Sequence, residues 1–141
     1  MACRAEDVIL DELLVAHLYR GQAVRFVARG LSMWPSVLDG DRVTVAPMHG
    51  QAKLGQIVCV QAESRFLVHR VIALGPNGRV KTRGDALTAA DGWFEAEKVH
   101  GRLVGIRRKG RRILFSEALY RVGIAKALGQ CRRSIRRFRS G

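Results

Sequence analysis

Two short segments of the chain carry side chains that can perform nucleophilic chemistry. Ser32 lies in Gly-Leu-Ser-Met-Trp-Pro (30–35), and a hydroxyl residue between glycine and proline indicates a turn that can present its Oγ to a substrate. His69 lies in the apolar segment Val-His-Arg-Val-Ile (68–72), where an imidazole could act as a general base. Each residue taken alone has a simpler interpretation, because turn serines are common and a histidine in a strand usually has a hydrogen-bonded ring.

A third segment supplies carboxylates. Lys-Thr-Arg-Gly-Asp (81–85) ends in Asp85, and Asp91 follows six residues later, although an aspartate after glycine is most often a turn former. Serine, histidine and aspartate together are the components of a Ser–His–Asp site, in which Ser32 attacks a carbonyl and His69 takes its proton and passes it to the leaving amine. An aspartate orients the imidazole, and the sequence leaves open whether Asp85 or Asp91 does so.

Short strands dominate the predicted secondary structure, with a helix at each end of the chain. Apolar residues at helical spacing predict a helix over 6–19 and a second, amphipathic helix from Ser116 onward. Between them the alternation of side chains predicts strands over 23–29, 42–46, 56–60, 66–74, 79–83, 99–107 and 111–115. We therefore expect a mainly β domain over 23–115, an N-terminal amphipathic helix within 1–22 and a basic amphipathic helix within 116–141.

Positive charge is concentrated at one end of the chain. The formal net charge is +13, and residues 102–141 contain 13 Lys and Arg with a single acid, Glu117, so that residues 1–101 are nearly neutral. Such asymmetry indicates an anionic partner for the basic tail, or else a solvated helix. An anionic membrane surface is favoured over nucleic acid, because no recognisable DNA-reading motif precedes the catalytic segments.

Cysteine spacing and hydropathy exclude several classes of protein. Cys3, Cys59 and Cys131 lie far apart, which predicts neither a metal site nor a disulfide framework, and Cys59 falls in an apolar strand that we expect in the core. No metal or other cofactor is expected.

The sequence has no run of about 18 apolar residues, so no transmembrane helix is predicted. The acids Glu6 and Asp7 do not fit a signal peptide. We expect a protein that is cytoplasmic or peripherally bound to a membrane.

The order of these segments resembles the signal peptidase I family and its relatives, the self-cleaving LexA-like repressors. Five family boxes are similar to residues 30–35, 40–45, 55–58, 69–72 and 82–85, and the resemblance covers roughly residues 24–106. Bacterial members carry a lysine as the base, whereas His69 is similar to the archaeal and endoplasmic-reticulum type, which uses a serine, a histidine and one or two aspartates.

This resemblance implies a partly open antiparallel β barrel and a serine endopeptidase. Its substrate would be a peptide or protein bound as an extended strand, from which a leader or signal segment is removed. Ser32, His69 and Asp85 match the family boxes directly, and Asp91 occupies about the place of a later aspartate of the histidine type. The resemblance also places the oxyanion hole and substrate groove at Gly30, Leu31 and Met33, with backbone N–H groups facing the oxyanion.

Two features depart from the family. Members usually have a membrane anchor, whereas the helix predicted at that place carries Asp7, Asp11 and Glu12, which exclude it from spanning a membrane. Gly30 offers no hydroxyl where some bacterial members place a serine that assists the oxyanion. Two other functions therefore stay open: a peptide-binding or regulatory domain that cleaves nothing, and a basic nucleic-acid-binding protein whose affinity would depend steeply on salt.

Overall fold

A computed structural model describes residues 5–63 and 65–114, with side chains described from Glu12 onward. The described part contains one α-helix, α1 (Ala5–Tyr19), and is otherwise mainly β. The strands are β1 (Val24–Val27), β2 (Arg42–Pro47), β3 (Ile57–Ala62), β4 (Arg65–Leu74), β5 (Val80–Arg83), β6 (Gly92–Phe94), β7 (Val99–Arg108) and β8 (Arg111–Ile113). Single 3₁₀ turns, η1 (Pro76–Gly78) and η2 (Ala96–Lys98), precede β5 and β7.

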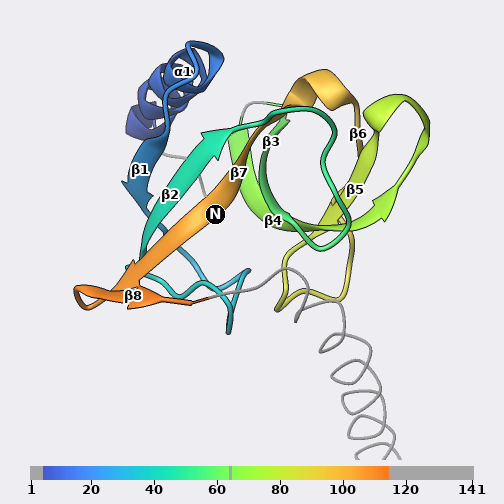
Figure 1. The fold of residues 1–141 in the computed structure, drawn as a ribbon. Helices are drawn as coiled ribbons and strands as arrows, with labels where there is room; N and C mark the ends of the chain where they lie inside the picture. Colours follow the sequence, from blue (N-terminus) through green and yellow to red (C-terminus); the bar gives the residue numbers. More distant parts are fainter. Residues whose placement is uncertain (1–4, 64, 115–141) are drawn as a thin grey trace, which may run out of the picture.

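The strands form one antiparallel sheet that curls into a half-barrel (Figure 1). Its order is β1-β2-β7-β3-β4-β5-β6, and β8 pairs with β7. The pairing shifts register at Thr44/Val45, Cys59/Val60 and Val71/Ala73. Such irregularities bend a strand and increase its twist, which is how a sheet of this width curls.

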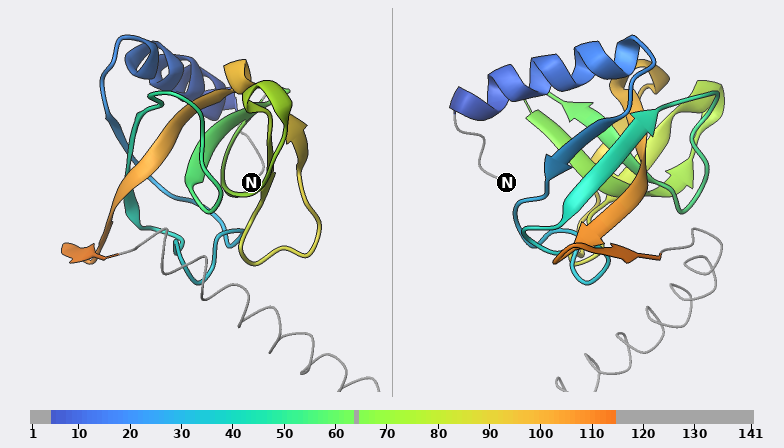
Figure 2. Two further views of the ribbon diagram at one scale, coloured as in Figure 1. Left: turned by 45° about the vertical axis from the view of Figure 1, so that its right-hand side comes forward. Right: turned by 60° about the vertical axis from the view of Figure 1, so that its left-hand side comes forward.

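The central strand β3 supplies side chains to two hydrophobic clusters. Ile57 and Cys59 point into the first cluster, whereas Val58 and Val60 point into the second. Successive side chains of a strand alternate between faces, so burial on both faces requires apolar residues at all four positions. Helix α1 lies across the half-barrel (Figure 2) and contributes the buried Leu14 and Leu18 to the first cluster.

The structure confirms the mainly β class, the first helix and each predicted strand, with ends that shift by a few residues. Cys59 is buried, as its apolar context predicts. The sequence analysis missed β6, a strand of three residues that is too short to show an alternating pattern. The predicted helix over 116–141 lies outside the described residues. Within the described part of the chain, α1 lacks the length and hydropathy that spanning a bilayer requires.

The loop between β1 and β2, which carries Ser32, is closed at its neck. The N–H of Ala28 donates to the carbonyl of Asp41 and the N–H of Gly40 donates to the carbonyl of Ala28, each at 2.8 Å. The Asp41 side chain is buried and accepts hydrogen bonds from the Leu38 N–H (2.8 Å) and from Nε and Nη2 of Arg108 (3.0 Å each). Burial raises the pKa of Asp41, but these hydrogen bonds and the Arg108 charge outweigh it and lower the pKa below 3.8.

Replacing Asp41 by Asn should therefore destabilise the fold in a pH-dependent manner. Because the pKa is lower in the folded chain than in the unfolded chain, the carboxylate stabilises the fold above pH 3.8, and this contribution is lost as the pH falls through the folded value. We expect Asp41→Asn to lower the free energy of unfolding by about 1–3 kcal/mol at neutral pH, with a smaller difference in acid, as measured by urea unfolding. Asp39→Asn, in the same loop but exposed, is the matched control. Equal stability of Asp41→Asn and the parent at neutral pH would contradict this role.

Candidate active site

Ser32 lies in a turn whose backbone is held from two sides. The N–H of Gly30, a glycine with a φ of 93°, donates to Oδ1 of Asp39 at 2.8 Å. The carbonyl of Ser32 accepts a hydrogen bond from the N–H of Ala86 at 3.0 Å. A Cβ added to Gly84 would lie 2.5 Å from that carbonyl oxygen, so the close approach of these two segments requires glycine.

His69 connects the serine to a carboxylate. Its Nε2 lies 3.1 Å from Oγ of Ser32, and its Nδ1 lies 2.6 Å from Oδ2 of Asp91. Asp91 is itself held by Thr82, whose hydroxyl donates to Oδ2 at 2.7 Å and whose carbonyl accepts the Asp91 N–H at 2.9 Å. His69 is 5% exposed, so its ring has little freedom to leave this alignment.

The electrostatics of Asp91 favour one arrangement of protons. Burial raises the pKa of this carboxyl, but hydrogen bonds from His69 and Thr82, and the charges of His69 and Arg65, outweigh burial and lower the pKa below its usual value. An ionised Asp91 is an acceptor only, so Nδ1 of His69 carries the hydrogen in this bond. Nε2 of the neutral ring is then the acceptor that faces the Ser32 hydroxyl, which is the arrangement that a general base requires.

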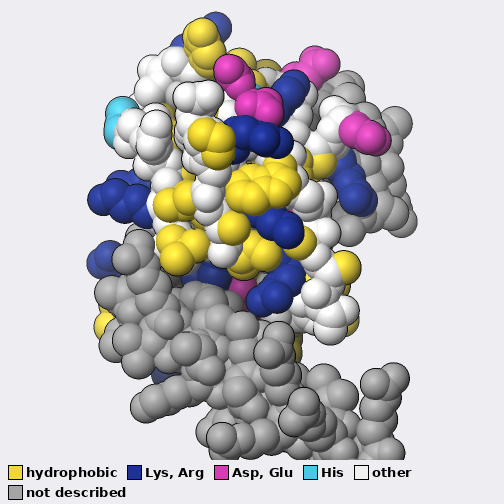
Figure 3. All heavy atoms as spheres, turned by 90° about the vertical axis from the view of Figure 1, so that its right-hand side faces the viewer, with side chains coloured by type: hydrophobic (Ala, Val, Ile, Leu, Met, Phe, Trp, Pro, Cys, Tyr) yellow, Lys and Arg dark blue, Asp and Glu magenta, His cyan; other side chains and the backbone are white. Residues whose placement is uncertain are grey.

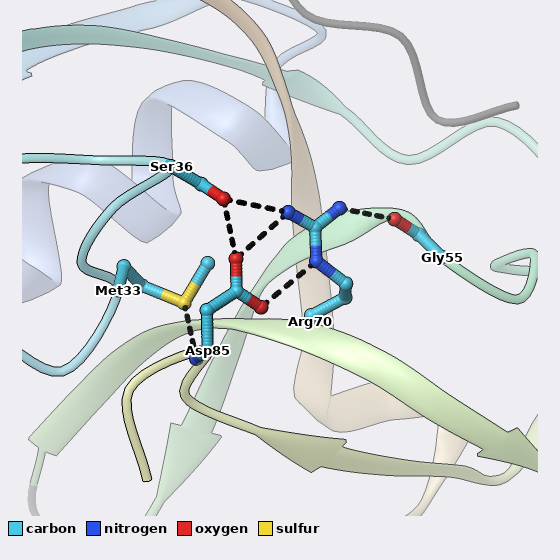
Figure 4. Close-up of polar contacts among 5 residues, drawn as sticks. All are labelled: Met33, Ser36, Gly55, Arg70 and Asp85. Carbon is cyan, nitrogen blue, oxygen red and sulfur yellow. Dashed lines mark hydrogen bonds and ion pairs between the residues drawn. The ribbon is translucent and has the colours of Figure 1, made fainter. Parts of the chain in front are cut away.

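Asp85 forms a buried ion pair with Arg70 (Figure 4). The guanidinium donates from Nε and Nη2 to the two carboxylate oxygens, each at 2.9 Å, and both side chains are about 5% exposed or less. Oγ of Ser36 donates to Asp85 at 2.6 Å, and Nη1 of Arg70 donates to the carbonyl of Gly55 at 2.8 Å. Of the two aspartates that the sequence left open, Asp91 is therefore the one placed to orient His69.

The two polar networks draw on the same three segments of the chain. One network is Ser32–His69–Asp91, and the other is Ser36–Arg70–Asp85. The turn and the closing loop each contact both His69 and Arg70, two adjacent residues of β4. The ion pair therefore holds in place the segments that carry the catalytic candidates.

Of the three residues expected at the oxyanion hole and substrate groove, two are engaged in contacts within the fold and one has an exposed side chain. The N–H of Gly30 is occupied by Asp39, and the Met33 side chain is buried, where its sulfur accepts the Asp85 N–H at 3.4 Å. The Leu31 side chain is 70% exposed beside the serine. The N–H of Ser32 donates to no acceptor among residues 5–63 and 65–114, which leaves it available to a ligand.

Sequence reasoning gave no role to Arg70, Ser36 or Thr82. A charged residue inside the apolar segment 68–72 was a usable signal for Arg70, because a buried guanidinium needs a carboxylate partner. Thr82 and Ser36 carry no such signal, because isolated hydroxyl residues in turns and strand ends are common and nothing in the local sequence marks Asp91 or Asp85 as their partners.

No match to this chain is found among models of protein families or among curated proteins. Within the described residues, no group of three His, Cys, Asp or Glu side chains is arranged to hold a metal ion. The interpretation of the site therefore rests on its geometry and on the chemistry of its side chains.

Replacing Asp85 by Ala should destabilise the protein strongly. The substitution removes the carboxylate that faces a buried guanidinium, so we expect the free energy of unfolding to fall by about 3–5 kcal/mol, as measured by urea unfolding. The double variant Arg70→Met with Asp85→Leu removes both charges and should be more stable than Asp85→Ala. If Asp85→Ala unfolds at the same urea concentration as the parent, the ion pair does not have the role described.

Proposed function

We propose that this protein is a serine endopeptidase of the signal-peptidase type with a histidine base, which cleaves a leader or signal segment from a peptide or protein. The observation that supports this most directly is the aligned chain of Ser32 Oγ, the His69 ring and the Asp91 carboxylate, at 3.1 and 2.6 Å. The serine lies 37 residues before the histidine and the aspartate 22 residues after it. Their convergence on one hydrogen-bonded line is what nucleophilic catalysis needs.

Each residue has a defined step in the proposed reaction. Ser32 Oγ attacks the scissile carbonyl while its proton passes to Nε2 of His69, and the ionised Asp91 stabilises the imidazolium. The carbonyl oxygen becomes an oxyanion that the N–H of Ser32 can bind. His69 then protonates the leaving amine, which departs as the C–N bond breaks. Water, deprotonated by His69, hydrolyses the acyl-enzyme and restores the serine.

Two strand edges near the site are open to an extended substrate. Within the described chain, β1 pairs only with β2, and residues 66–69 of β4 pair only with β3. A peptide that adds as a strand to either edge would bring its backbone toward the serine at the end of β1 and the histidine on β4. The curled antiparallel sheet is also compatible with the partly open LexA-like barrel that this proposal includes.

The proposal is tested first by covalent labelling, which needs no knowledge of the substrate. A fluorophosphonate probe should modify Ser32 with loss of fluoride, giving one adduct that mass spectrometry places on this residue. Ser32→Ala and His69→Ala should abolish labelling and keep the parent's circular dichroism. Thr88→Ala, which removes an exposed hydroxyl in the loop between β5 and β6, is the control and should still be labelled. Absence of labelling in the folded parent would favour a domain that binds peptides without cleaving them.

The role of Asp91 gives a second test. Asp91→Asn should lower the labelling rate at Ser32 by a factor on the order of 10⁴, because a neutral amide neither fixes the productive tautomer nor stabilises the imidazolium. The rate is measured from the time course of adduct formation. Glu95→Gln removes one exposed carboxylate and should leave the rate unchanged. If both variants react at the parent rate, the carboxylate has no catalytic function.

A further inference from the structure

Arginines form a continuous row across three strands on the outer face of the sheet. Arg42 of β2 lies directly opposite Arg107 of β7, and Arg107 lies directly opposite Arg112 of β8. All three side chains are exposed, and we call them the arginine row. The right-hand view of Figure 2 shows β2 and β7 side by side, with β8 at the lower end of β7.

The row points away from the hydrophobic core. The neighbouring residues Val43 and Ile106 are opposite one another and buried, so alternation along the strands directs Arg42 and Arg107 outward. Directly opposite side chains on adjacent strands have Cβ atoms about 5 Å apart, and like charges at such positions destabilise a sheet. The isolated domain therefore carries an unfavourable arrangement of charge on this face.

No carboxylate of the described side chains neutralises the row. The buried acid that precedes Arg42, Asp41, is engaged with Arg108 instead. Arg107 makes one hydrogen bond, to the carbonyl of Gly110 at 3.4 Å, which leaves its charge unpaired. An external anionic partner would relieve this repulsion.

The side chains around the row favour a lipid surface. Val27 lies opposite Arg42 on β1 and is 38% exposed, and Leu114 follows the row after β8 and is 87% exposed. Phe26 is the one Phe, Tyr or Trp in β1, β2, β7 and β8, and it packs against the core, so these strands present no outward Phe, Tyr or Trp on which a base could stack. Arginine interspersed with aliphatic side chains suits the headgroup region of a bilayer.

The β5–β6 side of the molecule has a different character (Figure 3). There hydrophobic side chains gather with both basic and acidic residues. Arg79 lies 5.6 Å from the ring centroid of Trp93 and forms an ion pair with Glu95 at 3.0 Å. Arg79 on that side therefore has partners within the fold, in contrast to the arginines of the row.

We propose that the arginine row docks the folded domain on an anionic phospholipid surface, with guanidinium groups on lipid phosphates and Val27 and Leu114 at the headgroup boundary. Arginine matches phosphate geometry with two parallel hydrogen bonds. The basic sequence that follows Leu114 would then approach the same surface. This inference does not depend on the peptidase activity, since none of its residues contacts Ser32, His69 or Asp91.

The test compares two full-length variants of equal net charge. Arg42→Gln, Arg107→Gln and Arg112→Gln together remove the row, and Arg20→Gln, Lys53→Gln and Lys98→Gln remove three exposed charges elsewhere. In co-sedimentation with vesicles that contain phosphatidylserine, loss of the row should weaken binding by about 100-fold, at roughly fivefold per arginine, whereas the control should stay within a few fold of the parent. Vesicles of phosphatidylcholine alone should bind none of the proteins appreciably.

Two further readouts separate lipid docking from its alternatives. At low ionic strength, removal of the row should raise the melting temperature relative to the control variant, and high salt should abolish the difference. Equal vesicle binding by the two variants would overturn the proposal. So would a row variant that binds vesicles like the parent but loses affinity for a single- or double-stranded oligonucleotide, because the partner would then be nucleic acid.

Discussion

The ion pair between Arg70 and Asp85 is the interaction on which the rest of the site depends. Burying two charges is costly, and their attraction offsets that cost only when the geometry is good and further hydrogen bonds satisfy both groups. Here the guanidinium meets the carboxylate through two donors, and Ser36 and the Gly55 carbonyl supply additional bonds. The residues of this network come from the turn after β1, from β4 and from the loop after β5. The hydrogen bonds of the ion pair therefore fix where those three segments lie relative to one another.

The catalytic candidates take their positions from the same arrangement. Ser32 is four residues before Ser36 in one turn, His69 adjoins Arg70, and Asp91 follows Asp85 in one loop. Once the ion pair is formed, the remaining freedom is removed by short local contacts, such as the Ala86 N–H on the Ser32 carbonyl. The hydrogen bonds of Ser32, His69 and Asp91 thus form in a site that is made rigid by a neighbouring network. That network, Ser36–Arg70–Asp85, takes no part in the proposed chemistry.

The end of β7 shows how one strand serves two purposes. Arg107 faces solvent in the arginine row, whereas Arg108 turns toward Asp41 at the neck of the loop that carries Ser32. The difference follows from the alternation of a strand. Arg107 has no carboxylate partner among the described side chains, whereas Arg108 neutralises the Asp41 carboxylate, whose side chain is 2% exposed and would be unfavourable as an unpaired ion.

The sequence by itself determined the mainly β class, the first helix and most strands, because alternating and helical periodicities report burial directly. It also identified Ser32, His69 and two aspartates as residues with the right chemistry. Only the tertiary structure decided that Asp91 contacts His69 while Asp85 pairs with Arg70, since both aspartates follow the same strand and have similar local contexts. The arginine row was equally hidden, because strand register, set by pairing between distant segments, decides which charges lie side by side.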